Sequence, residues 1–316
     1  MNWSNDPDSL TLSIAAVERD TGLSKDTLRV WERRYGFPAP ARDDGGERAY
    51  PLGQVERLRT IKRLLDAGHR PGRVVPMPED ELRHLAEATV DAPERRPVLP
   101  PVHDPVAPLL ALIRGHDIDG LRHALSREAH RLGLMRFVDE VIAPLNTAVG
   151  DAWLRGQIAI FEEHLYTDLL QSVLRQLRSA VPPPPPSATP RVLLGTLPGE
   201  PHGVGLLMVE TTLALEGATC FSLGVQTPAW DMVQAASALR ADIVALSFTG
   251  CMNPNQIVTS LQELRAKLPP TTALWAGGGA PALRRRMVDG VRVMAELTEL
   301  PAAVKSWRDA AAAVHP

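Results

Sequence analysis

The stretch RVLLGTLPGEPHGVGLL (191–207) decides the fold of the C-terminal part of this chain. It begins with a short apolar run, which is typical of a buried strand, and continues through a glycine-containing loop into a helical segment. Four more apolar runs follow: ATCFSLG (218–224), DIVALSF (242–248), TALWAGG (272–278) and VRVMA (291–295). Helical stretches separate the runs, and we expect them at 203–216, 229–240, 254–267 and 280–288. Strands that alternate with helices predict a Rossmann-like α/β domain with a parallel sheet.

The residues before this domain differ in composition. Apolar residues recur at helical spacing ahead of a run of five prolines, Pro182–Pro186, so a four-helix bundle and then a semi-rigid spacer are expected. Upstream of the bundle, prolines and charges indicate a linker with a short helix at about 79–88. We divide the chain into a flexible N-terminus (1–11), a winged helix-turn-helix domain (12–75), a linker (76–103), the bundle (104–181), the polyproline linker (182–189) and the Rossmann-like domain (190–316).

Composition excludes several classes of protein. The 316 residues are 44% hydrophobic and 22% charged, which is ordinary for globular domains and not for fibrous or wholly disordered chains. No apolar run reaches the length of about 18 residues that a membrane-spanning helix needs. The first residues, MNWSNDPDSL, lack the basic and apolar regions of a secretory signal peptide. Cys220 and Cys251 are far apart, fit a reducing cytosol and are expected to pack as small apolar groups. We expect a cytoplasmic protein that is not an enzyme, since no catalytic set of residues is evident.

The N-terminal domain carries a local excess of positive charge. Twelve Lys/Arg and seven Asp/Glu lie between Lys25 and Arg73, whereas the formal net charge of the whole chain is −3. Gly22 is expected to end a first helix and Ser24 to cap a second, which together make a helix-turn-helix. In the second helix Lys25, Arg29 and Arg33 recur every four residues and form a cationic stripe. Such a stripe suits phosphate contacts in a DNA groove, although it also occurs on solvated helices of structural domains.

The segment after that helix strengthens the DNA-binding interpretation. PARDDGGERAYP contains a Gly-Gly turn between short extended arms, which predicts a hairpin wing. Together, LSIAAVERDTGLSKDTLRVWERRYG, GGERAY and VERLRTIKRLLDAGH resemble the DNA-binding domain of MerR-type transcription regulators. The resemblance implies contacts with double-stranded operator DNA, made by dimers, through Lys25, Thr27, Arg29, Arg33, Arg34, Arg42, Arg48 and Tyr50.

The loop after the first strand of the Rossmann-like domain contains Glu200-x-His202-x-x-Gly205. A histidine on an exposed loop is a natural metal ligand, and a carboxylate two residues earlier can accept its second N–H and fix the tautomer. The pattern resembles the D-x-H-x-x-G motif of cobalamin-binding domains, with Glu in place of Asp. That resemblance implies that His202 is the lower axial cobalt ligand. It also places the nucleotide tail of the cofactor beside Ser247, Gly277 and Gly278, with Leu246 and Thr249 flanking it.

The bundle has a second signature, Trp153 followed by Glu163-His164. This spacing resembles the W-x9-E-H motif of CarH-type photoreceptor repressors, in which these residues cap adenosylcobalamin. The order of domains also resembles that family. The resemblance implies a light-responsive repressor whose adenosylcobalamin controls a dimer or tetramer on DNA.

One departure leaves alternatives open. In photoreceptors of this kind a histidine directly after the tryptophan ligates cobalt in the light state, and this chain has Leu154 there. The light state could therefore lack this ligand, or the ligand domain could sense a corrinoid without photochemistry, or another tetrapyrrole. A corrinoid methyl-carrier protein would share the bundle and the sheet but has no need of the DNA-binding domain. A degenerate ligand domain that works through protein contacts is the remaining alternative.

Overall fold

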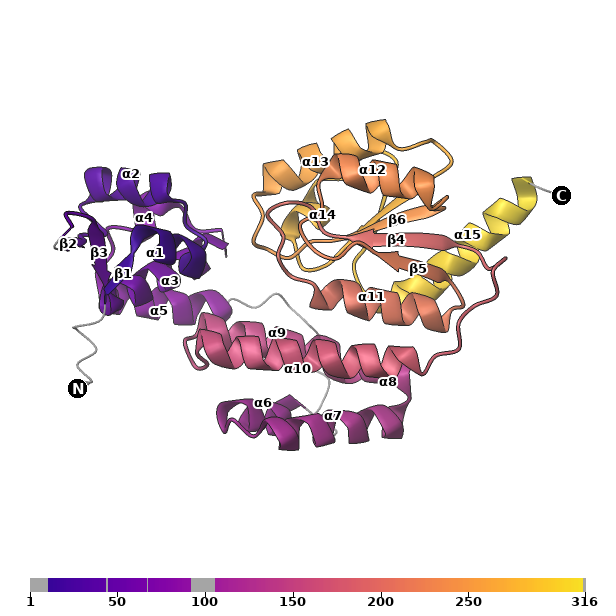
Figure 1. The fold of residues 1–316 in the computed structure, drawn as a ribbon, viewed down its shortest axis with the longest axis horizontal. Coiled ribbons are helices and arrows are strands. Elements are labelled where there is room, and N and C mark those ends of the chain that lie inside the picture. The colour runs from indigo at the N-terminus through magenta and orange to yellow at the C-terminus, as the bar shows by residue number, and fades with distance from the viewer. Residues whose placement is uncertain (1–10, 44, 67, 92–105, 315–316) are drawn as a thin grey trace. The chain divides into compact units, whose positions relative to one another are not determined.

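The computed structural model describes residues 11–43, 45–66, 68–91 and 106–314, which fall into two compact units (Figure 1). Of the described residues, the first unit comprises those between 11 and 91 together with 151–157, and the second comprises 106–150 and 158–314. Among the described residues no helix is both long and apolar enough to cross a bilayer.

The first unit begins with the predicted helix-turn-helix. Helix α1 (Ile14–Thr21) ends at Gly22, whose φ of 69° is left-handed, and α2 (Lys25–Tyr35) begins after Ser24, whose hydroxyl accepts from the backbone N–H of Thr27. A left-handed residue favours glycine because it has no Cβ to collide with the backbone. The turn is therefore fixed by the local sequence, as predicted.

The wing and two further helices complete this unit. Strands β2 (Ala41–Arg42) and β3 (Arg48–Pro51) form the expected hairpin, and β1 (Thr11–Ser13) adds to the other edge of β3. Helices α3 (Leu52–Asp66), α4 (Pro71–Val74) and α5 (Glu79–Asp91) follow. The helix expected within a linker is thus longer than predicted, and its Leu82, which is 1% exposed, packs into the core of the unit.

The second unit contains the predicted parallel sheet. Its strands are β4 (Arg191–Gly195), β5 (Thr219–Ser222), β6 (Ile243–Ser247), β7 (Ala273–Gly277) and β8 (Val291–Met294). They are all parallel and lie in the order β5-β4-β6-β7-β8. The strand order reverses at β4, and in open α/β sheets such a reversal opens a crevice beyond the carboxyl ends of the strands.

Helices cover both faces of the sheet because alternate strand residues point to opposite sides. Val192 and Leu194 share a core with α11 (Val204–Leu215) and α15 (Leu300–Val314). Leu193 faces the other core, beneath α12 (Ala229–Ala238), α13 (Pro254–Lys267) and α14 (Pro281–Arg285) (Figure 1). The C-terminal helix α15 was not among the expected helices.

The helical bundle lies on the α11 side of the sheet. Its elements are α6 (Val106–Arg114), α7 (Ile118–Leu132), α8 (Leu134–Phe137), a π-helical turn (Val138–Ile142), α9 (Ala143–Leu154) and α10 (Ile160–Ser179). Helix α10 runs along α11, where Arg178 pairs with Glu210 at 2.9 Å (Figure 1). The hydroxyl of Tyr166 donates to Asn146 at 2.7 Å, and this amide in turn contacts the sulfur of Met208. The bundle is therefore joined to the sheet domain by polar as well as apolar contacts.

Replacing Leu82 by Ala tests whether α5 is part of the folded core of the first unit. Removing a fully buried leucine side chain leaves a cavity, so the free energy of unfolding should fall by about 2–5 kcal/mol. Arg83→Ala is the matched control on the exposed side of the same helix, and it should change stability by less than about 0.5 kcal/mol. Urea denaturation of the full chain measures both. Equal effects would mean that α5 is a linker helix.

Candidate functional site

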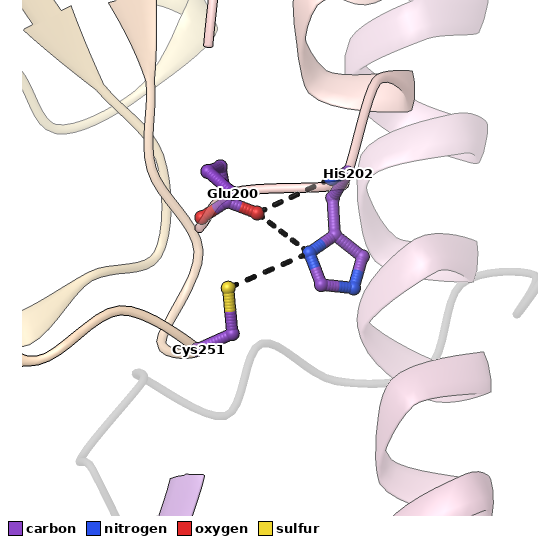
Figure 2. Close-up of side chains that lie close together, drawn as sticks. All are labelled: Glu200, His202 and Cys251. Atoms are coloured by element: carbon purple, nitrogen blue, oxygen red, sulfur yellow. Dashed lines mark hydrogen bonds and ion pairs between the residues drawn. The ribbon is translucent and has the colours of Figure 1, made fainter. Parts of the chain in front are cut away.

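The candidate site lies where the strand order reverses. Two loops meet there: one follows β4 and carries Glu200 and His202, and the other follows β6 and carries Thr249 and Cys251. Because β4 and β6 are hydrogen-bonded neighbours, the sheet brings together residues about fifty positions apart in the chain. Figure 2 shows Glu200, His202 and Cys251 directed toward one another.

Glu200 is the fixed point of this site. Its side chain is fully buried, and its carboxylate accepts hydrogen bonds from the backbone N–H of Thr249 at 2.6 Å and from the Thr249 hydroxyl at 2.9 Å. It also accepts from Nδ1 of His202 at 2.6 Å. Burial alone raises the pKa of Glu200, but the hydrogen bonds from His202 and Thr249 outweigh it, so the pKa is lowered overall. The buried group is thus held as a carboxylate.

His202 presents one ring nitrogen to the carboxylate and the other away from it. All of its side-chain hydrogen bonds among the described residues use Nδ1, and 53% of the side chain is exposed. Interactions with Cys251 and Glu200 raise its pKa to about 10, against the opposing effect of burial. When the neutral ring donates from Nδ1, its lone pair lies on Nε2, which is the tautomer that a metal centre at Nε2 requires. The Glu200–His202 hydrogen bond expected from the sequence is therefore present.

A largely apolar cavity of about 200 Å³ lies nearby, between α11 and the sheet. Its lining includes the three residues predicted to lie beside a nucleotide tail, Ser247, Gly277 and Gly278, together with Gly205 of the Glu200-x-His202-x-x-Gly205 pattern. A Cβ at Gly205 would stand 2.9 Å from the Ser247 hydroxyl, so a side chain there would close the space. Aromatic and aliphatic side chains, among them Trp275 and Leu246, form the walls. Such a slot suits a flat, largely apolar group with few polar contacts.

Two residues of the second loop differ from expectation. Thr249 was expected beside the nucleotide tail, but it does not line this cavity and instead hydrogen-bonds Glu200. Cys251 was expected to pack as a small apolar group, but its sulfur lies 3.8 Å from Nδ1 of His202 and 3.2 Å from the Thr249 hydroxyl. The position of Cys251 two residues after Thr249 was the only sequence signal for this contact.

Of the residues in the W-x9-E-H spacing, the structure brings Glu163 and His164 close together, whereas Trp153 belongs to the other unit. Glu163 and His164 lie at the start of α10, with His164 Nε2 3.7 Å from the Glu163 carboxylate and 74% of the His164 side chain exposed. Trp153 belongs to the first unit, where its backbone carbonyl accepts from Arg63. The convergence of the three residues therefore stays a prediction. The side chain of Leu154 lies outside what the structure describes.

The predicted DNA-contacting residues lie mostly on one helix and the wing. Arg29, Arg33, Arg34 and Arg42 are exposed, while Lys25, Thr27 and Arg48 are partly buried. Three of these cations have acidic neighbours: Lys25 pairs with Glu18, Arg29 with Asp26, and Arg48 with Glu32.

Tyr50 was expected to contact DNA, and the structure corrects this. Its side chain is 0% exposed and packs in the hydrophobic core of the unit, where β3 is the central strand of the three-stranded sheet. Among the described residues its hydroxyl has no hydrogen-bond partner.

Comparisons with known proteins fit this geometry. The profile of the MerR HTH family regulatory proteins matches residues 12–76, and profiles of B12 binding domains match 106–178 and 190–304. The HTH-type transcriptional repressor CarH of Myxococcus xanthus is 29% identical over 270 residues, covering 85% of this chain and 89% of that protein. The repressor CarA of the same organism is 29% identical over 272 residues, covering 86% and 88%. The chain is a MerR-type, B12-binding transcriptional regulator.

Two solved structures are similar to parts of this chain at low sequence identity. The monomethylamine corrinoid protein of Methanosarcina barkeri is 16% identical, with a TM-score of 0.47, over 64% of this chain and 98% of that one. A cobalamin-binding protein from Desulfitobacterium hafniense is 18% identical, with a TM-score of 0.33, over 65% and 99%.

Gly278 and Gly279 form a matched pair for testing the cavity wall. Gly278 has a φ of 108°, and a Cβ there would collide with the carbonyl oxygen of Phe248, whereas a Cβ at Gly279 meets nothing within 4 Å. Gly278→Ala should lower the free energy of unfolding by about 1–3 kcal/mol or more, because the strained backbone and the collision add. Gly279→Ala should change it by less than about 1 kcal/mol. Thermal denaturation distinguishes the two, and equal values would contradict the described wall.

Proposed function

We propose that this regulator binds adenosylcobalamin and that the state of this ligand, set by light, controls its oligomeric state and its hold on operator DNA. The observation that carries the proposal is the Glu200–His202 pair, with Nε2 directed away from the carboxylate, beside the cavity of Gly205 and Ser247. The similarity to CarH and CarA over most of the chain supports a repressor. We further propose that the chain acts through binding and performs no catalysis.

The residues present suit a base-off corrinoid. His202 would supply the lower axial nitrogen through Nε2, while Glu200 holds the ring through Nδ1. The longer arm of Glu, compared with the Asp of the motif, is accommodated because two hydrogen bonds from Thr249 fix the carboxylate in place. Gly205, Ser247, Gly277 and Gly278 would receive the nucleotide tail. When bound, adenosylcobalamin supplies a cobalt–carbon bond that visible light can break.

Residues of the bundle would contact the face of the ligand that His202 does not contact. Trp153 would shield the adenosyl group, and Glu163 and His164 would contact it. A change in these contacts would alter which packing of the bundle is lowest in free energy. DNA affinity would follow, because linked DNA-binding domains that bind together gain avidity and lose it when separated.

Leu154 favours a second candidate function. A leucine cannot ligate cobalt, so a light state with a protein nitrogen on the upper face is not available at this position. The regulator would then respond to the presence or form of a corrinoid without a light step. Oligomerisation and DNA release would follow loading alone.

The deciding experiment loads the full chain with adenosylcobalamin in the dark and records absorption, size-exclusion elution and affinity for a duplex selected in vitro. Each is recorded again after green light. The proposal expects a base-off spectrum in the dark, together with a change in elution and weaker DNA binding after illumination. Changes on loading but not on illumination would favour the second candidate, and identical elution in every state would refute the switch.

His202→Ala tests the axial ligand in the same assay. The variant should lose the histidine-ligated spectrum and bind the corrinoid at least about tenfold more weakly, because even outer-shell partners of a metal ligand are worth 10- to 100-fold. His130→Ala, on an exposed face of α7, is the control and should behave as wild type. An unchanged spectrum for His202→Ala would remove this residue from the ligand role.

Arg33→Ala tests the DNA-binding surface independently of the ligand. Loss of one phosphate contact should weaken binding to a mixed-sequence duplex and reduce the slope of log affinity against log salt by about 1. Arg136→Ala removes an exposed arginine of the bundle that is paired with Glu140, and it should leave both quantities unchanged. Fluorescence anisotropy over a salt series measures the effect. An unchanged slope for Arg33→Ala would mean that Arg33 does not contact a DNA phosphate.

A further inference from the structure

The site contains a third potential ligand that cobalamin binding does not use. Cys251 presents its sulfur to the side of His202 that faces Glu200, 3.8 Å from Nδ1 (Figure 2). The nitrogen of His202, a carboxylate oxygen of Glu200 and this sulfur all lie within 4.8 Å of one another. Among the residues that the structure describes, no other group of three such ligands was found.

We propose that, when no corrinoid is bound, Glu200, His202 and Cys251 bind a thiophilic divalent cation such as Zn²⁺. One nitrogen, one oxygen and one sulfur donor form a set that suits Zn²⁺ and does not suit Mg²⁺ or Ca²⁺, which take oxygen ligands. Three protein ligands leave a fourth position, which water can take, as in zinc sites with three protein ligands.

The distances from Nδ1 of His202 to the other two ligand atoms require only a small adjustment. Zinc bonds of about 2.0–2.3 Å in a tetrahedral arrangement place neighbouring ligand atoms roughly 3.2–3.8 Å apart. The distance from Nδ1 to the Cys251 sulfur is already 3.8 Å, whereas Nδ1 and the Glu200 oxygen are 2.6 Å apart and must separate by less than about 1 Å. The half-exposed imidazole of His202 can make this movement, while Glu200 stays anchored by Thr249.

The cation and the corrinoid require different tautomers of His202. Binding releases the thiol proton of Cys251 and the Nδ1 proton of His202 to solvent, because a thiolate and an unprotonated imidazole nitrogen are the ligands. With a metal on Nδ1, the neutral imidazole carries its one proton on Nε2 and has no lone pair there. Cobalt ligation needs the opposite arrangement, with the proton on Nδ1 and the lone pair on Nε2. Bound cation would therefore exclude a corrinoid ligated by His202. This exclusion rests on the proposed function, whereas cation binding does not depend on it.

The two cysteines of the chain provide a matched control. Cys220 is partly buried beside the backbone carbonyl of Glu210, and its sulfur belongs to a different part of the domain. Corrinoid-free, metal-free protein is titrated with aqueous Co²⁺ as a spectroscopic probe and then with Zn²⁺ in competition. Wild type and Cys220→Ser should each bind one Co²⁺ with a thiolate-to-metal charge-transfer band in the near ultraviolet, which Zn²⁺ abolishes. Cys251→Ser should lack the band and bind Zn²⁺ at least about tenfold more weakly.

The absence of a thiolate band in wild type, or an unchanged band and affinity in Cys251→Ser, would overturn the cation site. Cys251→Ala serves as a second variant, and circular dichroism checks that both variants are folded. Adenosylcobalamin loading is then compared with and without Zn²⁺. Zinc should slow or reduce the histidine-ligated spectrum in wild type but not in Cys251→Ser, and equal inhibition of both would overturn the exclusion. If no protein binds a corrinoid, the proposed function fails while the Co²⁺ titration still decides the cation site.

Discussion

A fully buried carboxylate is costly unless its oxygens are satisfied, and Glu200 is the group on which the ligand site depends. The backbone of one loop, the hydroxyl of Thr249 and the ring of His202 all donate to it. These bonds join the loop after β4 to the loop after β6 across the point where the strand order reverses. Because the carboxylate cannot move without leaving donors unpaired, it also fixes the tautomer and direction of His202.

Two glycines shape the cavity beside the Glu200–His202 pair. Gly205, on the first turn of α11, keeps the approach to Ser247 clear, and Gly278 allows the chain to turn at the end of β7 against Phe248. The missing side chain at Gly205 therefore keeps part of the cavity open in an otherwise close-packed domain. A flat group could enter there without displacing the core that surrounds it.

The bundle is tied to this domain along α10 and α11. The Arg178–Glu210 pair is largely shielded from solvent, and the chain of contacts from Tyr166 through Asn146 to Met208 ends beside the cavity that Asn146 and Met208 both line. Asn146 of the bundle is therefore part of the wall of the cavity that we propose receives the ligand. The surface that we propose binds DNA belongs to the first unit, where α2 and the wing carry arginines that pair with acidic neighbours.

Much of this protein was determined by local sequence. Gly22 and Ser24 define the turn between two helices, five apolar runs become the five strands, and the spacing of Glu200 and His202 places a carboxylate beside an imidazole within one loop. Local patterns determine such features because helix caps, strand alternation and contacts within a loop involve residues close together in the chain.

Tertiary structure alone decided the rest. Thr249 bonds to Glu200, Cys251 faces His202, Tyr50 is buried, and α5 packs on α3. Each of these depends on which strands and helices become neighbours. That choice is made by the burial of apolar surface over the whole unit, and no periodicity in a short window of sequence records it.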